Sequence, residues 1–188
     1  MIPTFNIIDF GPVSKAFLAR GINDFSNACL HVQSLPFARI DNPIDFLSVL
    51  SEGKGTCSTK HALLATLALE NGREDIELMV GIYLIDEVTH PQLKTVFIEH
   101  GIIGVPENHA FLRCGQQRYD FSRSDWSIVD FEHRIVREQR CDPNQMHDWK
   151  PMIHKHYIGG WLKRQQIDLT IDQIWAIREK CVLQWMDF

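Results

Sequence analysis

The segment at residues 62–69 limits the fold more than any other part of the chain, because it consists of alanine and leucine with a single threonine. A helix of this composition is apolar on every side and has to be surrounded by protein. We therefore predict a central buried helix that follows a glycine-rich turn at 53–55. Thr56 is a good N-cap, which makes Cys57 the first helical residue, and Gly72 is the expected end.

Cys57 lies where a helix start favours thiolate over thiol. Backbone N–H groups are unpaired in the first turn, and the helix dipole is positive there. Lys54 and Lys60 add positive charge nearby, and the flanking glycines keep side chains clear of the sulfur. Taken alone, a cysteine on so apolar a helix fits an inert core residue better than a nucleophile. The residues downstream favour a thiol nucleophile.

The stretch at 107–122 reads as two short strands around Gly115-Gln116. Glycine at the first central position is typical of a two-residue type II′ turn. Such a turn puts His109 and Asp120 on the same face of the hairpin, one diagonal step apart, with about 7 to 8 Å between their backbones. The spacing therefore predicts a His-Asp pair. A three-residue turn would put the two side chains on opposite faces.

Other residues compete for the same roles. His61 follows Cys57 by one helical turn and could reach the sulfur without the hairpin, although a histidine at a polar end of the core explains it too. Asp125 and Asp130 are further from the turn than Asp120 and are alternative carboxylates.

A cysteine, a histidine and a carboxylate together support acyl chemistry. The thiolate attacks an acyl carbon, the imidazole protonates the leaving amine, and the carboxylate orients the imidazole. The backbone N–H of Cys57 would stabilise the oxyanion, and Gln33, Asn108 or Ser51 could supply a second donor. We expect a peptide, protein or small amide as substrate. Water or an amine can resolve the acyl-enzyme, and we prefer hydrolysis.

The order of these motifs carries a family resemblance. Gly-Thr-Cys at 55–57 opens an apolar helix, His-Ala-Phe at 109–111 lies on a strand, and Asp120 lies on the next strand. This pattern resembles the transglutaminase-like superfamily of papain-type cysteine enzymes over residues 20–125.

The resemblance implies Cys57 as nucleophile, His109 as general acid and base, and Asp120 as the orienting carboxylate. It also implies an α+β fold in which the cysteine-bearing helix and other helices pack on an antiparallel β-sheet. Family members often have tryptophan where Phe111 stands and proline where Phe121 stands. These differences leave open a second function, a catalytically inactive domain that binds a protein or ligand.

Composition limits the possible partners and the cellular compartment of the protein. The net charge of -5 and pI near 6.0 argue against nucleic acid as a partner. Five cysteines without regular spacing indicate free thiols in a reducing compartment, and we expect a cytoplasmic protein because no secretory signal opens the chain. No apolar run is long enough to span a membrane.

We expect neither a cofactor nor a metal. His147 and the His154-Lys155-His156 cluster could suggest a metal site. However, helical residues two apart do not share a face, and no accepted zinc signature accompanies them.

At 188 residues and 45% hydrophobic, the chain suits one core with an appendage. We predict a core at 1–130 that contains the site and a mainly helical extension at 131–188 that packs on it. Within the extension we expect a break at Gly159-Gly160 and a capping box from Thr170 to Gln173. We interpret its tryptophans as packing residues rather than as the wall of a substrate cleft.

The remaining elements follow from apolar spacing and from glycine and proline positions. We predict helices at 12–20, 24–35 and from 42 to Gly53, a buried strand at 76–85, and a loop or lid near the site at 89–104.

Overall fold

A four-stranded antiparallel sheet organises the structure, a computed structural model that describes residues 2–186 without the side chains of Asp130, Trp185 and Met186. Within that part of the chain, seven α-helices pack on the sheet, so the predicted α+β class is confirmed. The strand order is β3-β2-β1-β4. The strands are β1 (Ile76–Asp86), β2 (Gly104–Cys114), β3 (Gln117–Tyr119) and β4 (Arg137–Arg140).

β1 and β2 pair along their whole length, from Ile76 opposite Cys114 to Asp86 opposite Gly104. The turn from β2 to β3 has the predicted two-residue length, since Cys114 opposes Gln117. Gly115 has φ 59°, as the first central position of a type II′ turn requires.

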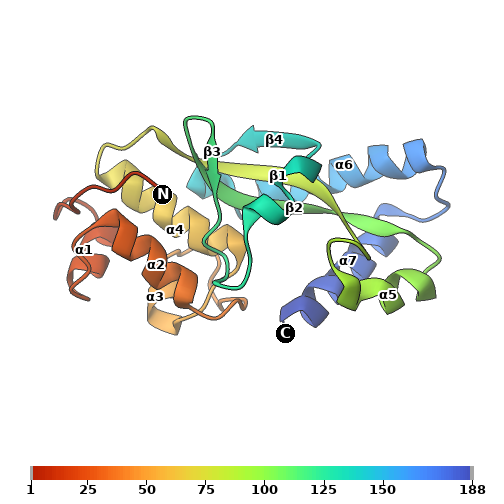
Figure 1. The fold of residues 1–188 in the computed structure, drawn as a ribbon, viewed down its shortest axis with the longest axis horizontal. Coiled ribbons are helices and arrows are strands. Elements are labelled where there is room, and N and C mark those ends of the chain that lie inside the picture. Colours follow the sequence, from red (N-terminus) through yellow and green to blue (C-terminus); the bar gives the residue numbers. More distant parts are fainter. Residues whose placement is uncertain (1, 187–188) are drawn as a thin grey trace.

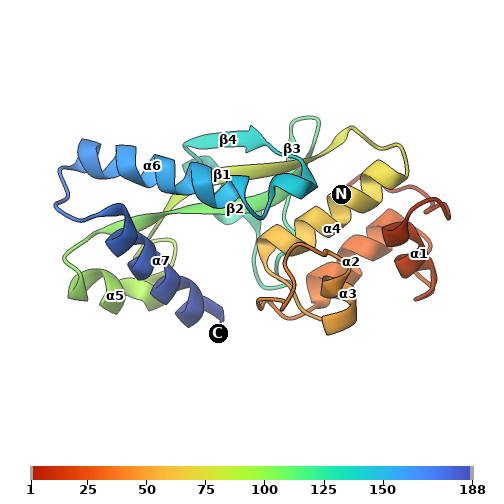
Figure 2. The same cartoon turned by 180° about the vertical axis from the view of Figure 1, so that it is seen from behind.

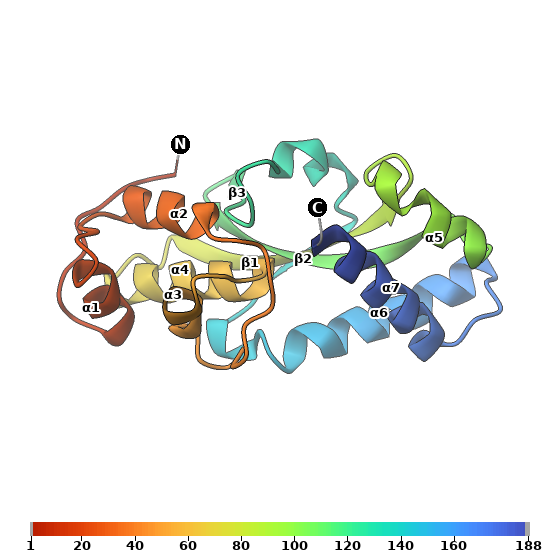
Figure 3. The ribbon, with the colours of Figure 1, turned by 90° about the horizontal axis from the view of Figure 1, so that it is seen from below.

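The helices gather at the two ends of the long strands (Figure 1). The first four lie at one end and the last three at the other, which the view from below also shows (Figure 3). None of the helices described is both long and apolar enough to cross a membrane. The helices are α1 (Pro12–Leu18), α2 (Phe25–Ser34), α3 (Ser48–Glu52), α4 (Cys57–Glu70), α5 (Lys94–Glu99), α6 (Trp149–Gln165) and α7 (Ile171–Met186).

Each face of the long strands β1 and β2 belongs to its own hydrophobic core. Leu78 and Val80 of β1 pack with α1, α2 and α4, whereas Met79, Tyr83 and Ile85 pack with α5, α6 and α7. Because successive side chains of a strand point to opposite faces, one pair of strands serves both cores. The N-terminus of α4 lies between these two groups of helices.

The third predicted helix is shorter than expected, because α3 begins only at Ser48. The N–H of Ile44 donates to the Asn42 side chain at 3.4 Å, and the N–H of Leu47 donates to Asp45 at 3.0 Å. These local side-chain bonds compete with helical ones. Ile44 is 67% exposed rather than part of an apolar stripe.

The segment at 89–104 is not a lid near the site. It forms a short 3-10 helix, η1 (Pro91–Leu93), followed by α5. Leu93 and Phe97 are buried in the core of the α5 to α7 end. The sequence-based prediction failed because α5 is less than two turns long, too short to show a clear period.

The predicted helix break in the C-terminal third is absent. α6 runs unbroken through Gly159-Gly160, and Figure 2 shows it along the sheet. A Cβ at Gly159 would lie 3.0 Å from Cδ1 of Ile171, so glycine there lets α6 and α7 approach closely. The capping box is confirmed by bonds of 3.2 and 2.7 Å between Thr170 and Gln173. The division at residue 130 stays a prediction.

Candidate active site

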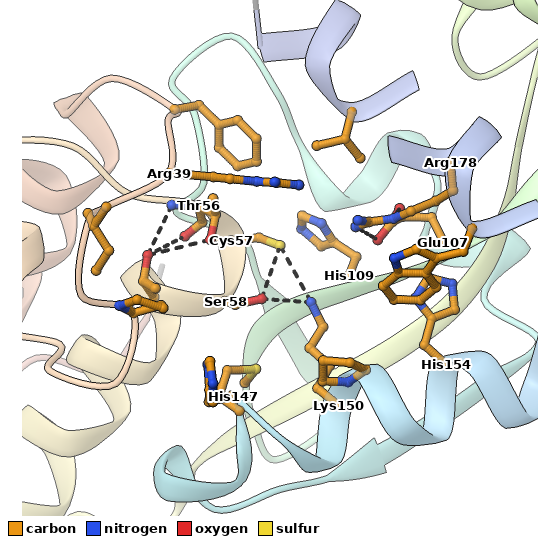
Figure 4. Close-up of a pocket in the computed structure, with 18 residues that line it drawn as sticks. Arg39, Thr56, Cys57, Ser58, Glu107, His109, His147, Lys150, His154 and Arg178 are labelled. Atoms are coloured by element: carbon orange, nitrogen blue, oxygen red, sulfur yellow. Dashed lines mark hydrogen bonds and ion pairs between the residues drawn. The ribbon is translucent and has the colours of Figure 1, made fainter. Parts of the chain in front are cut away.

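Cys57 is the first residue of α4 and Thr56 is its N-cap, as predicted. Glycine is needed at both turn positions, for different reasons. Gly53 has φ 65°, and a Cβ at Gly55 would lie 2.9 Å from Cγ of Lys60. The Cys57 side chain lines a cavity of about 430 Å³ between the two groups of helices (Figure 4).

His109 and Asp120 form the predicted pair. His109 is on β2, Asp120 directly follows β3, and 2.8 Å separates His109 Nε2 from Asp120 Oδ2. The other carboxylate oxygen, Oδ1, accepts the N–H of Ser122 at 2.8 Å. Both side chains of the pair are almost fully buried. Because Nε2 is bound to the carboxylate, Nδ1 is the histidine nitrogen available to the sulfur.

The site holds its charges as a thiolate and an imidazolium. Burial alone would raise the pKa of the Cys57 thiol, but the charges of Lys150 and His109, with hydrogen bonds from His109 and the N–H of Ala110, lower it to about 6. Burial opposes the charge on His109, yet Asp120 and the thiolate raise its pKa to about 10. Burial likewise opposes ionisation of Asp120, but His109 holds its pKa well below the usual range.

The hydrogen bond from Ala110 follows from the short third strand. β3 pairs only with 112–114 of β2. The edge of β2 before residue 112 is therefore not paired with β3. The Ala110 N–H on this part of β2 donates a hydrogen bond to the sulfur of Cys57.

His61 is not the base. Its Nδ1 bonds to the Cys57 carbonyl at 2.8 Å, and its Nε2 accepts the N–H of Phe121 at 2.8 Å. Both ring nitrogens are therefore engaged with the backbone, and burial lowers the pKa of His61 to about 4. Asp125 pairs with Arg123 at the surface instead of with a histidine. The side chain of Asp130 lies outside the described residues.

Lys150 is the lysine at the sulfur, and the sequence analysis did not identify it. Its Nζ lies 3.9 Å from Cys57 Sγ and 2.7 Å from Ser58 Oγ. Lys54 instead pairs with Glu52 at 3.2 Å. Lys60 interacts electrostatically with Cys57, but its Nζ is held by two backbone carbonyls. Lys150 is 93 residues from Cys57, so no local pattern indicates it.

None of the three expected oxyanion donors lines the cavity. Gln33 donates to the backbone carbonyls of Asp120 and Arg123. Ser51 is exposed and donates to a carbonyl of α3. Asn108 is buried on the face of β2 opposite to His109, and its amide atoms have no partner within the described residues.

The C-terminal helices form one wall of the cavity. Among their described tryptophan side chains, Trp149 and Trp161 pack against the cores as we expected, whereas Trp175 lines the cavity. Arg178 of α7 makes a bidentate ion pair with the buried Glu107 of β2, at 2.7 and 2.8 Å. Arg39 lines the cavity beside Cys57 (Figure 4). It pairs with Glu179 of α7. The other lining residues from α6 and α7 are Lys150, Pro151, His154, Trp175 and Val182.

The other four cysteines differ from Cys57 in their electrostatics. Burial raises the pKa of Cys29, that of Cys141 to about 12 and that of Cys181 to about 11. The pKa of Cys114 is raised by partial burial and by Asp75. Cys57 is the one cysteine whose pKa is lowered.

The suggested histidine cluster has another role. His154 is buried and bonds to the Pro106 carbonyl at 2.8 Å. Within residues 2–186, no group of three or more His, Cys, Asp or Glu side chains is arranged to hold a metal ion.

No protein-family model, curated protein or solved structure matches this chain. Arguments about its function therefore rest on the geometry and electrostatics of the site.

Proposed function

We propose that the protein is a cysteine-dependent acyl enzyme that hydrolyses an amide through a thioester intermediate. The observation that carries the proposal is the buried Cys57, His109 and Asp120 arrangement in which the thiol pKa is lowered to about 6. A cysteine that only packs in a core does not require an imidazolium and an ammonium group beside its sulfur. We also propose, from the order of the motifs, that the fold belongs to the transglutaminase-like superfamily.

The reaction runs in two halves. Cys57 Sγ attacks the acyl carbon, the carbonyl electron pair moves to oxygen, and the C–N bond breaks as His109 gives its proton to the leaving amine. His109 then takes a proton from water as the water attacks the thioester. The C–S bond breaks and the thiolate returns. Asp120 stays ionised and holds His109 in one orientation.

The charges of the cavity favour water over a lysine-type acceptor. Arg39, Lys150 and Arg178 line it, whereas Glu107, the one carboxylate among the lining residues, is taken by Arg178. An ammonium substrate would meet cations without a free carboxylate to bind it.

A reactive acetyl ester such as p-nitrophenyl acetate tests the proposal. Wild-type protein should show a burst of nitrophenol, a single acetyl adduct on Cys57 by mass spectrometry, and turnover after the burst. Cys57→Ala should lose all three. Asp120→Asn should fold, because Asn can still accept the Ser122 N–H, while turnover falls on the order of 10²- to 10⁴-fold.

Cys114→Ala is the matched control, because that cysteine is partly exposed and distant from the cavity. It should behave as wild type. Equal turnover in wild type and Cys57→Ala would eliminate catalysis at this site. The alternative, an inactive binding domain, would then explain the fold.

A further inference from the structure

Lys150 is a buried lysine of α6 whose ammonium group lies beside Cys57 and Ser58 at the start of α4. It is the second residue of α6, its side chain points to the start of α4 (Figure 4), and it is only 8% exposed. Its Nζ donates to Ser58 Oγ at 2.7 Å and lies 3.9 Å from Cys57 Sγ. An ammonium group has three N–H donors, so one remains for a further partner.

The thiolate is the anion closest to Lys150. The Glu107 carboxylate also interacts electrostatically with Lys150, but it is paired directly with Arg178. Among the described residues, no carboxylate oxygen lies within 4.0 Å of its Nζ. The other cations around the cavity differ, since Arg178 is paired with Glu107 and Arg39 with Glu179. A buried charge without a counterion is costly, so Lys150 depends on negative charge at the reacting centre.

Acyl transfer moves that negative charge. Once Sγ attacks the substrate, the sulfur becomes neutral and the charge appears on the carbonyl oxygen, which is two bonds from Sγ. Oxyanion donors lie about 2.7–3.1 Å from that oxygen. A donor that lines the cavity 3.9 Å from the sulfur can therefore reach it.

We propose that Lys150 is a catalytic residue that donates a hydrogen bond to the oxyanion, as the second donor beside the Cys57 N–H, with Ser58 holding its ammonium in place. This inference rests on the proposed acyl chemistry. Lys150 stays protonated throughout, and the leaving amine takes its proton from His109. The electron pair on the oxyanion returns to the carbonyl when the amine or the thiolate leaves.

A simpler role would be to stabilise the thiolate alone. Two electrophiles separate the roles. The thiolate displaces iodide from the sp³ carbon of iodoacetamide without forming an oxyanion, whereas its attack on p-nitrophenyl acetate forms one. Loss of thiolate slows both reactions equally. Loss of an oxyanion donor slows only acylation.

The experiment compares the rates of alkylation and acylation of Cys57 from pH 5 to 10 in wild type and Lys150→Met. We expect the alkylation midpoint to move to higher pH in the variant. At pH values above that midpoint, alkylation should return to the wild-type rate while acylation stays about 10²-fold lower. Ser58→Ala should show a weaker form of the same split, because Lys150 loses its hydrogen-bond partner.

Lys54→Met is the matched control, because Lys54 precedes the same helix but pairs with Glu52. It should leave both rates unchanged. If Lys150→Met does not fold, Lys150→Arg gives the same comparison with the charge kept. We expect the alkylation midpoint to stay low and acylation to fall, because a planar guanidinium cannot occupy the ammonium position.

Equal loss of both rates in the Lys150 variant, with full recovery of acylation at high pH, would overturn the inference and leave the proposed function intact. Failure of the proposed function looks different. In that case the wild-type protein itself would form no acetyl adduct at Cys57.

Discussion

Burial alone would keep the Cys57 thiol protonated, so its charge depends on the residues around it. Two cations outweigh the desolvation: Lys150, which comes from a distant helix, and His109, whose own charge is fixed by Asp120. The site is therefore a chain of charges of alternating sign. Neighbours of opposite charge lower the pKa of Cys57 and of Asp120 and raise that of His109, which keeps these three groups ionised.

The first prediction concerns pH. A pKa of about 6 for Cys57 means that the thiolate is present above that pH, and a pKa of about 10 for His109 means that the imidazolium is lost above that pH. The kcat/KM for the ester, which reports on the free enzyme, should therefore rise with a midpoint near 6 and decline toward 10. Iodoacetamide labelling, read by mass spectrometry, should show the lower midpoint at Cys57 alone.

Cys57→Ala provides the background for that measurement. A labelling midpoint near the ordinary thiol value of about 8.5 would contradict the ion pair. The same holds if Cys114 is labelled first.

The sequence could predict the three central residues because the information is local. A helix start places Cys57, and a two-residue turn fixes the register of His109 and Asp120. Lys150 and the oxyanion geometry depend on how distant elements pack. A single sequence holds no signal for such contacts.

At the scale of elements, α6 shows how packing overrides a local signal. Two consecutive glycines predict a break, yet the helix continues because its sides are held by β2 and α7. The glycines have different surroundings. Gly159 faces Ile171 at the start of α7, whereas Gly160 meets only the end of the Arg164 side chain, at 3.1 Å.

The second prediction uses this difference. Gly160→Ala should raise the free energy of unfolding by about 0.5–1 kcal/mol, because alanine loses less backbone entropy in a helix and the Arg164 guanidinium can move aside. Gly159→Ala should gain less or lose stability, since Ile171 has to shift. Urea unfolding of both variants measures the difference. A larger gain for Gly159→Ala would contradict the close approach of α6 and α7.

On the scale of the whole molecule, the long strands connect two cores and the cavity lies between them. β1 and β2 contribute one face to each core, and β4 of the C-terminal third pairs with β1. The buried ion pair between Glu107 of β2 and Arg178 of α7 adds a second connection beside the cavity. Lys150 reaches Cys57 because the starts of α6 and α4, which belong to the two groups of helices, face each other across the cavity. Periodicity predicts that each helix is amphipathic or buried, but not which end of the sheet it covers.

The last prediction tests that connection. Glu107→Gln should lower the free energy of unfolding by about 3 kcal/mol, because the substitution leaves the charge of Arg178 poorly compensated in a buried setting. Glu77→Gln is the matched control, since Glu77 pairs with Arg113 near the surface, where an ion pair contributes about 1 kcal/mol or less.

Burial opposes ionisation of Glu107, but Arg178 lowers its pKa from 4.5 to about 2. Wild type should therefore lose this stabilisation as pH falls from about 4.5 toward 2, while Glu107→Gln lacks that part of the pH dependence. Urea unfolding at pH 7 and at pH 3, followed by tryptophan fluorescence and far-ultraviolet circular dichroism, measures both effects. The two signals should coincide, because every tryptophan lies after residue 125 while the dichroism reports on all helices. An earlier fluorescence transition would mean that the C-terminal helices unfold separately from the rest of the molecule. Equal destabilisation by the two variants would mean that the Glu107–Arg178 pair contributes no more than a surface ion pair.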